Sequence, residues 1–323
     1  MVKVSVIIAA WNAAATLEAC IDSLQGQQGM TPEQLEILVV DDCSTDATWS
    51  LLQQWRERWP NLVPLQTAVN SGPSAARNLG LSHASGDWVA VVDGDDRIQP
   101  TRFKQMLALA EPQGLDICFD NLAMRRAETP QQIEGYLVPA ELAPELAEPW
   151  TLAGYAALNM PYESAALLGF LKPIMRRDFL ARHALQYREE LRNSEDFILI
   201  VECLIAGARI GYLNESLYDY FIYNSSLSGK FNLEAHRKLM AVEQSILHTS
   251  GQLSAADRSA LQRHLQSLQL AEESNQLFKL VREKNAAQLF SAFWRYRANG
   301  LIHARRLSAS LARKLMKQQA RGR

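Results

Sequence analysis

Residues 93–96 are the segment whose residue types most directly indicate chemistry. The sequence Asp93-Gly94-Asp95-Asp96 places three carboxylates within four residues, directly after the apolar run 88–92. Carboxylates this close repel one another, and a bound divalent cation relieves that repulsion. Mg²⁺ or Mn²⁺ held by one or two carboxylates completes its coordination shell with phosphate oxygens, which indicates a nucleoside diphosphate as the leaving group. An acidic turn in solvent, without a metal, is the alternative interpretation.

A second acidic pair, Asp41-Asp42, follows the apolar run 36–40 in the same way. A carboxylate there can accept hydrogen bonds from a base N–H or a ribose hydroxyl, although an acidic turn before a helix cap has the same composition. Arg77 follows a turn that begins at Asn70. Its planar guanidinium suits a phosphate or the acidic strand ends, and an arginine at the surface is the alternative.

The pair Glu195-Asp196 precedes an apolar helix predicted from Phe197 to Gly207. Carboxylates in the first turn stabilise a helix through its dipole, which is a purely structural role. The six histidines show no metal-ligand spacing, and the four cysteines include no Cys-x-x-Cys pair. A zinc site or a disulfide framework is therefore not expected, and a reducing compartment is the simpler interpretation.

These polar segments lie in a chain that alternates between strand and helix patterns. Short β-branched runs predict buried parallel strands, and helical spacing predicts helices between them. The predicted strands are 3–9, 36–40, 62–66, 88–92 and 116–121, and the predicted helices are 16–27, the segment after Asp46, 74–81 and 103–110. This order predicts an α/β sheet with both acidic clusters at the carboxyl ends of its strands. Residues 125–150 predict an excursion with weak structure, and helical periodicity dominates from Leu233.

Charge is distributed unevenly along the chain. Of 33 Lys/Arg and 35 Asp/Glu, residues 291–323 hold nine Lys/Arg and no Asp/Glu, so the rest carries 24 basic against 35 acidic side chains. This tail predicts a basic amphipathic helix that lies on an anionic membrane surface or packs on the acidic body. A single tail does not form a nucleic-acid groove. With no signal peptide and no membrane-spanning run in the sequence, we expect a cytoplasmic location, either free or peripheral on the inner face of the cytoplasmic membrane.

Five segments, taken together, resemble glycosyltransferase family 2, the inverting enzymes of the GT-A fold. The resemblance covers roughly residues 3–228 and is carried by VSVIIAAWN (4–12), ILVVDDCSTD (37–46), NSGPSAARNLGL (70–81), WVAVVDGDD (88–96) and the segment 194–220. It implies a Rossmann-like, mostly parallel sheet flanked by helices, the GT-A nucleotide-diphospho-sugar transferase fold. We expect this catalytic domain at 1–230, with a nucleotide-sugar-binding half at 1–122 and an acceptor half at 123–230, followed by a helical C-terminal extension at 231–323.

The resemblance also implies roles for individual residues. Asp196 matches the catalytic base that deprotonates the acceptor hydroxyl, with Glu195 beside it. Asp95 matches the direct metal ligand, supported by Asp93 and Asp96, and the cofactor is a divalent cation, Mn²⁺ or Mg²⁺. Trp11 is implied to lie beside the base and Asp42 to contact it. The complete set implied to bind the nucleotide sugar is Ala9, Trp11, Asn12, Asp41, Asp42, Asn70, Arg77, Asp93 and Gly94.

The sequence departs from the family pattern in a few places. Ala9-Ala10 stands where a Pro-Thr or Pro-Ala pair is usual, Trp11 replaces the common tyrosine, and Cys43 replaces a frequent glycine. The stretch after Tyr220 lacks the arginine often found there. The resemblance therefore does not identify a residue that clamps the diphosphate.

The predicted activity is that of a metal-dependent, inverting glycosyltransferase of the hexosyltransferase type. It would move a sugar from a nucleotide-sugar donor, with UDP as the default nucleotide, to a hydroxyl of a saccharide or lipid-linked acceptor in surface or extracellular polysaccharide biosynthesis. A nucleotide-sugar-binding scaffold without turnover is the alternative, which the intact acidic segments disfavour. A nucleotidyltransferase would need a glycine-rich phosphate loop with a basic residue after the first strand, and residues 10–14 do not form one.

Overall fold

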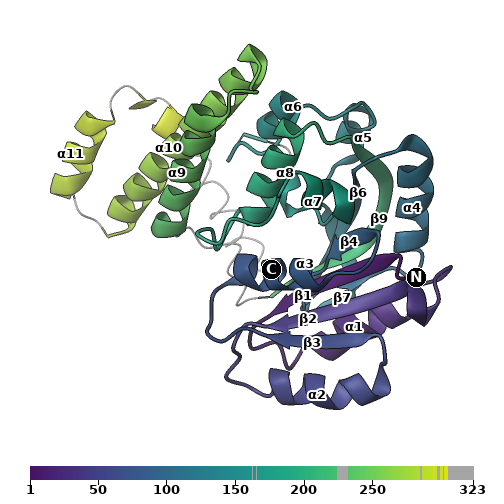
Figure 1. Ribbon diagram of the computed structural model, residues 1–323. Coiled ribbons are helices and arrows are strands. Elements are labelled where there is room, and N and C mark those ends of the chain that lie inside the picture. The colour runs from purple at the N-terminus through teal and green to yellow at the C-terminus, as the bar shows by residue number, and fades with distance from the viewer. Residues whose placement is uncertain are drawn as a thin grey trace.

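The chain folds around one large mixed sheet with helices on both faces, followed by a group of C-terminal helices (Figure 1). The computed structural model describes residues 1–161, 163–164, 166–223, 232–283, 286–296, 299–300 and 302–304. Within these residues the sheet has nine strands, in the order β3-β2-β1-β4-β8-β6-β9-β5, with β7 paired to β6.

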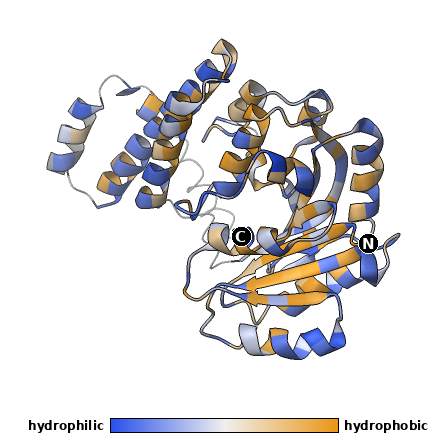
Figure 2. Cartoon of the chain, viewed as in Figure 1, coloured by the Kyte–Doolittle hydropathy of each residue, from blue (hydrophilic) through white to orange (hydrophobic). Residues whose placement is uncertain are grey.

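The N-terminal half of the sheet is parallel. It consists of β1 (Val4–Ala10), β2 (Leu35–Asp41), β3 (Leu62–Gln66) and β4 (Trp88–Val91). β1, β2 and β4 are apolar runs with almost every residue buried, as parallel strands covered by helices on both faces require, and they are among the most hydrophobic segments in Figure 2. Ala10 pairs with Asp41, so the carboxyl ends of β1 and β2 meet at one edge.

The second half of the sheet mixes strand directions. β8 (Ile174–Arg176) runs antiparallel to both β4 and β6 (Ile117–Arg126), and β9 (Ile210–Ile222) runs parallel to β6. β5 (Arg97–Ile98) and β7 (Thr129–Tyr136) add antiparallel pairs to β9 and β6. This mixture places the segments before β8 and after β4 next to each other.

Helices cover both faces of the parallel half. α1 (Leu17–Gln25), α2 (Thr48–Arg58) and α4 (Arg102–Gln113) join the large core that includes Val6 and Ile8. α3 (Pro73–His83) covers the opposite face, where Ile7 lies. A Cβ atom on Gly80 of α3 would come within 2.6 Å of Ile7 Cγ2, so glycine is needed for this close helix–strand approach. The remaining short helices are α5 (Ala143–Leu146), α6 (Leu152–Ala157), α7 (Arg177–Arg182) and α8 (Glu195–Ile205), with three-residue 3₁₀ turns at 32–34, 140–142 and 168–170.

The strands and helices predicted up to residue 121 are all present, with small shifts of their ends. The prediction of weak structure at 125–150 is wrong, because this segment contains β7 and α5. The sequence pattern does not predict β7, because TPQQIEGY is largely polar and mostly exposed and so lacks the apolar alternation of a half-buried strand. Its backbone pairing with β6 holds it in place.

The C-terminal helices are α9 (Leu233–Thr249), α10 (Ala255–Arg282) and α11 (Ala286–Arg295), which confirms the helical periodicity from Leu233. The side chains of Asn232 and Ser254 accept hydrogen bonds from the first backbone amides of α9 and α10, as N-caps do. α10 packs against both α9 and α6. None of the helices in the described part of the chain combines the length and apolar character needed to cross a bilayer. Most of the predicted basic tail, residues 305–323, lies outside the described residues.

Candidate active site

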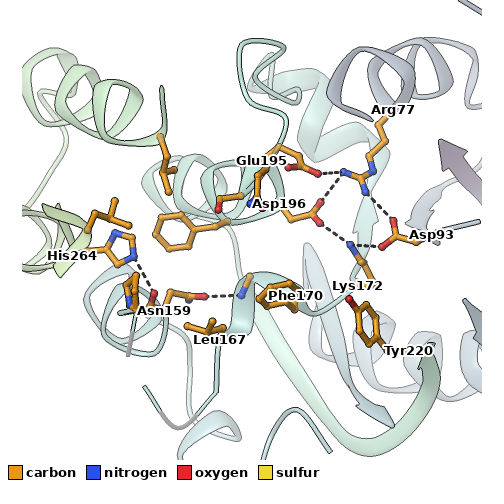
Figure 3. Close-up of a pocket in the computed structure, with 17 residues that line it drawn as sticks. Arg77, Asp93, Asn159, Leu167, Phe170, Lys172, Glu195, Asp196, Tyr220 and His264 are labelled. Atoms are coloured by element: carbon orange, nitrogen blue, oxygen red, sulfur yellow. Dashed lines mark hydrogen bonds and ion pairs between the residues drawn. The ribbon is translucent and has the colours of Figure 1, made fainter. Parts of the chain in front are cut away.

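A cluster of five charged side chains gathers at the carboxyl end of β4 (Figure 3). Asp93 follows β4, Arg77 comes from α3, and Glu195 and Asp196 form the first turn of α8. Lys172 comes from the segment that leads into β8. The cluster therefore joins residues that are up to 119 positions apart in sequence, from Arg77 to Asp196. Three carboxylates face two cations, which leaves one excess negative charge.

Arg77 is the hub on one side of this cluster. Its Nη1 lies 2.5 Å from Glu195 Oε1 and 3.5 Å from Asp196 Oδ1, and its Nη2 lies 2.9 Å from Asp93 Oδ1. The residue is 4% exposed, and its guanidinium carbon lies 5.3 Å from the centre of the Tyr187 ring. The interpretation of Arg77 as a surface arginine is wrong, and its pairing with an acidic strand end is confirmed for Asp93.

Lys172 bridges the same carboxylates from the other side. Its Nζ lies 3.0 Å from Asp93 Oδ2 and 2.8 Å from Asp196 Oδ2. Burial on its own would lower the pKa of Lys172, but the charges of Asp196 and Asp93 raise it above its usual range. Burial on its own would raise the pKa of Asp93, yet Lys172 and Arg77 outweigh it and lower this pKa to about 2. The cluster is thus held as a network of charged groups.

The other two carboxylates of the 93–96 segment differ sharply from each other. Asp96 is buried and accepts hydrogen bonds of 2.8 Å from the Tyr218 hydroxyl and from the Phe221 backbone amide. Burial first, and then the charges of Asp93 and Asp95, raise the pKa of Asp96 well above its usual range. The Asp95 residue is exposed, yet partial desolvation of its carboxylate, and then the charge of Asp93, raise its pKa to about 6.

These surroundings suit a metal bound through few protein ligands. The described residues contain no group of three or more His, Cys, Asp or Glu side chains arranged to hold a metal. Asp93 and Asp96 have protein partners, whereas the Asp95 carboxylate forms no ion pair among the described residues and only feels the charge of Lys172. A single carboxylate whose pKa is raised gains from a cation, and Mg²⁺ or Mn²⁺ is commonly held by one or two carboxylates with phosphate oxygens. Asp95 therefore fits such an ion as its main protein ligand.

Five of the residues predicted to bind the nucleotide sugar lie at the adjoining ends of β1 and β2, whereas Arg77 and Asp93 belong to the charged cluster. The five are Ala9, Trp11, Asn12, Asp41 and Asp42. Trp11 is 55% exposed beyond β1. Asn12 has a left-handed backbone, with φ of 51°, and its Oδ1 accepts a 2.8 Å hydrogen bond from the Thr45 amide. The turn after β1 is thereby fixed to the turn after β2. Ala9 lies in β1, one residue before the end of the strand, and Gly94 is buried next to Asp93 in the sequence.

The two predicted aspartates at the end of β2 are buried and already have protein partners. Asp42 accepts hydrogen bonds from the backbone amides of Ser71 at 2.9 Å and Gly72 at 2.7 Å. Asn70 donates to the Asp42 carbonyl at 3.1 Å, and Asp41 accepts from Gln66 at 2.9 Å. These contacts shape the loop that leads into α3. The structure therefore brings Asp41, Asp42 and Asn70 together, and none of the three forms an ion pair with the charged cluster.

The charged cluster forms one end of a cavity of about 290 Å³. Its other end is lined by residues that sequence analysis did not single out, among them Asn159, Phe170 and His264 (Figure 3). Lys172 was missed as well. One signal could have found it, since Lys172 is the single charged residue in the otherwise apolar segment 166–175. A lone charge in a buried run needs a partner, although the sequence does not show which.

Comparisons with known proteins agree with this architecture. Residues 5–173 match the family model described as Glycosyl transferase family 2. The chain is 34% identical over 250 residues to the succinoglycan biosynthesis protein ExoO of Rhizobium meliloti (strain 1021), an alignment that covers 76% of this chain and 68% of ExoO.

Two solved structures resemble the chain at low sequence identity. S. aureus TarS in complex with UDP-GlcNAc is 22% identical, with a TM-score of 0.68 over 90% of this chain and 79% of that one. The mannosyltransferase PcManGT from Pyrobaculum calidifontis, in complex with GDP-Man and Mn²⁺, is 18% identical, with a TM-score of 0.61 over 97% of this chain and 80% of that one. These likenesses confirm the predicted GT-A fold.

Proposed function

The chain belongs to glycosyl transferase family 2, and from this premise we propose that it transfers a sugar from a nucleotide-sugar donor to an acceptor hydroxyl with inversion at the anomeric carbon. The observation that carries the proposal is the pairing of Asp196 with Asp93 through Lys172 and Arg77, at the carboxyl end of β4. Ligands of α/β sheets bind at this edge. Asp95 lies beside the cluster, where a diphosphate-bound cation would be placed.

The fold and the relatives support the proposed donor class. TarS was solved with UDP-GlcNAc and PcManGT with GDP-Man, so both are nucleotide-sugar complexes of this fold. A UDP-sugar is the first donor class to test here. ExoO is named as a succinoglycan biosynthesis protein, which supports a saccharide or lipid-linked acceptor in extracellular polysaccharide synthesis for this chain.

A divalent cation would be held by Asp95, with Asp93 and Asp96 behind it. When bound, such an ion neutralises negative charge on the departing nucleoside diphosphate. Arg77 and Lys172 add fixed positive charge next to Asp93. By offsetting most of the negative charge of the three carboxylates, these two cations reduce the repulsion that negative charge developing on the leaving group would meet.

Asp196 is the proposed general base. In the structure its Oδ2 contacts Lys172 Nζ at 2.8 Å, and its Oδ1 lies 3.5 Å from Arg77 Nη1. The acceptor hydroxyl loses its proton to Asp196 while its oxygen forms a bond to the anomeric carbon. The bond from that carbon to the diphosphate oxygen breaks, and the nucleoside diphosphate leaves with the electron pair. One displacement of this type inverts the anomeric centre.

The remaining functional predictions concern location. A peripheral position on the inner face of the cytoplasmic membrane would rest on the basic segment 291–323. The described part of this segment includes the end of α11, where Trp294 is 59% exposed. Contact of this segment with an anionic membrane stays a proposal, and binding of nucleic acid is not proposed.

A donor screen tests the proposed function. We would measure nucleoside diphosphate release from UDP-glucose, UDP-galactose, UDP-GlcNAc and GDP-mannose, with Mn²⁺ or Mg²⁺ and after chelation. Wild type should release diphosphate from one donor in a metal-dependent manner. Asp95→Asn should need a higher metal concentration, and Asp196→Asn should bind nucleotide without turnover. Nucleotide binding without release from any donor would instead support a scaffold, and no nucleotide binding at all would contradict both.

A further inference from the structure

The far wall of the cavity is built by the C-terminal helices. Leu239 of α9 and His264 and Leu268 of α10 line it, across from Asp196. Figure 3 shows His264 at one end of the cavity and the charged cluster at the other, with Phe170 between them. The volume of about 290 Å³ lies at the low end for ligand pockets. This space suits a single sugar unit better than a long segment of an oligosaccharide.

His264 ties this wall to the catalytic elements. Its Nδ1 lies 2.8 Å from Glu243 Oε1 and its Nε2 lies 3.1 Å from the Asn159 carbonyl oxygen. The Asn159 side chain in turn accepts a 2.7 Å hydrogen bond from the Gly169 amide, three residues before Lys172. α10 is thus connected through hydrogen bonds to the segment that carries Lys172.

A second contact leads from His264 to the proposed base. The imidazole ring stacks on Phe197, with ring centres 4.6 Å apart, and Phe197 directly follows Asp196 in α8. Phe197 continues a column of stacked rings through Tyr155 and Trp150 to Phe119 on β6. The position of α10 is therefore coupled to the first turn of α8.

All three basic side chains that line the cavity already have partners. Arg77 and Lys172 contact the carboxylates of the cluster, and the two ring nitrogens of His264 lie within hydrogen-bonding distance of Glu243 and Asn159. The excess negative charge of the cluster would therefore repel an anionic acceptor group, and none of these three basic side chains is free to pair with it. Its burial would be unfavourable.

The other lining residues match an uncharged sugar ring. Phe170, Leu239 and Leu268 offer apolar surface for the C–H face of a pyranose, while Asn193 and Tyr220 bring polar groups to its hydroxyls. We propose that this cavity binds a neutral sugar unit of the acceptor, with α9 and α10 as its specificity-determining wall. The proposal rests on the proposed function, because a hydroxyl of that unit must reach Asp196.

The first test compares two acceptor probes that differ only in charge. p-Nitrophenyl β-glucoside and p-nitrophenyl β-glucuronide share one ring, and the second carries a carboxylate. Galactoside and N-acetylglucosaminide analogues extend the neutral set. At least one neutral probe should be favoured at least about tenfold over the glucuronide, a difference of about 1.4 kcal/mol. The comparison is of kcat/KM where the probes are glycosylated and of Kd where they only bind. Equal or better use of the glucuronide overturns the proposal, as does failure of every neutral probe to bind.

The second test narrows the cavity from the helical wall. Leu268→Phe should raise the KM of the neutral probe at least about tenfold, while the Kd of UDP changes less than twofold, because Leu268 lies on the wall of the cavity that α10 forms, across from the charged cluster. Leu270→Phe is the matched control on α10, outside the lining, and should leave the KM unchanged. If Leu268→Phe does not fold, Leu239→Phe makes the same test from α9. An unchanged KM in a folded variant overturns the wall assignment. Absence of UDP binding and donor turnover in wild type would instead refute the proposed function itself.

Discussion

Two arginine–carboxylate groups, one sealed in the core and one open to the cavity, use the same side chains in different ways. Arg102 and Asp120 are both fully buried, and the guanidinium binds the carboxylate in a bidentate manner at 3.0 and 2.8 Å. Arg77 instead contacts three carboxylates along the cavity. The sealed pair is balanced in charge, whereas the open cluster has three carboxylates for two cations.

The balance of charge separates a structural role from a chemical one. Burial raises the pKa of Asp120, and the charge of Arg102 opposes this rise without cancelling it. The ionised form of Asp120 therefore depends on Arg102 as its counterion. Arg102 also donates a hydrogen bond to the Lys172 carbonyl oxygen. The sealed pair therefore holds the backbone of Lys172, whose ammonium belongs to the open cluster. The sealed pair thus supports the open cluster, and of the two groups only the open cluster lines the cavity.

The largest effect is expected from breaking the sealed pair. Asp120→Asn leaves the Arg102 guanidinium charged and without a counterion in the core, and we expect it to lower the free energy of unfolding by about 3–5 kcal/mol. Urea denaturation followed by tryptophan fluorescence measures this. Glu134→Gln is the matched control, because Glu134 forms a 3.0 Å pair with Arg126 at the surface and should change stability by less than about 1 kcal/mol. Equal losses of unfolding free energy in the two variants would show that burial does not make the sealed pair more important for stability than a surface pair.

The corresponding change in the open cluster should affect activity and spare stability. Asp196→Asn removes the proposed base and leaves two carboxylates for two cations, so the charges become balanced. We expect transfer to fall roughly 10²- to 10⁴-fold, while the urea midpoint stays the same or rises. Steady-state kinetics with the active donor, beside the same denaturation assay, measures both. Asp178→Asn, an exposed carboxylate on α7, should keep wild-type activity. A large loss of stability in Asp196→Asn would show that Asp196, like Asp120 in the sealed pair, mainly stabilises the fold.

The sequence predicts the sheet better than it predicts the site. β1, β2 and β4 are apolar runs of strand length between helices, a pattern that leaves few other folds. β7 escapes because an exposed polar strand carries no periodic signal. The two arginines show the limit for the site. Both lie in the N-terminal halves of helices, and their partners lie 18 residues away for Arg102 and up to 119 away for Arg77.

Only the folded chain distinguishes these partners, since strand order decides which segments meet. Lys172 illustrates the point. Its isolation in an apolar run indicates a buried charge, but β8 must insert between β4 and β6 before Lys172 reaches Asp93. The residues recognised through the family pattern, such as Asp95 and Asp196, are those whose local sequence is distinctive. Residues whose neighbours are assembled from distant segments, such as His264, carry no such signature.

A smaller effect on activity is expected from Lys172. Lys172→Met leaves three carboxylates beside Arg77 alone, which increases the negative charge next to the leaving group, and we expect kcat to fall roughly tenfold to 100-fold. Lys172→Arg should restore only part of this loss, because a planar guanidinium does not reproduce the position of an ammonium between two carboxylates. The comparison of kcat in the three proteins is the measurement. An unchanged kcat in Lys172→Met would mean that Lys172 has only a structural role.

The smallest effect is expected where neither burial nor the cavity is involved. Arg182 pairs with Asp178 one helical turn away on α7 at 3.4 Å, and both side chains are more than 60% exposed. Solvent screens such a pair, so Arg182→Gln should change the free energy of unfolding by less than about 0.5 kcal/mol and leave kcat unchanged. The same denaturation and kinetic assays apply. If this variant lost as much stability as Asp120→Asn, then burial would not be what separates the sealed pair from other ion pairs, and the role given to Arg102 in positioning Lys172 would need another cause.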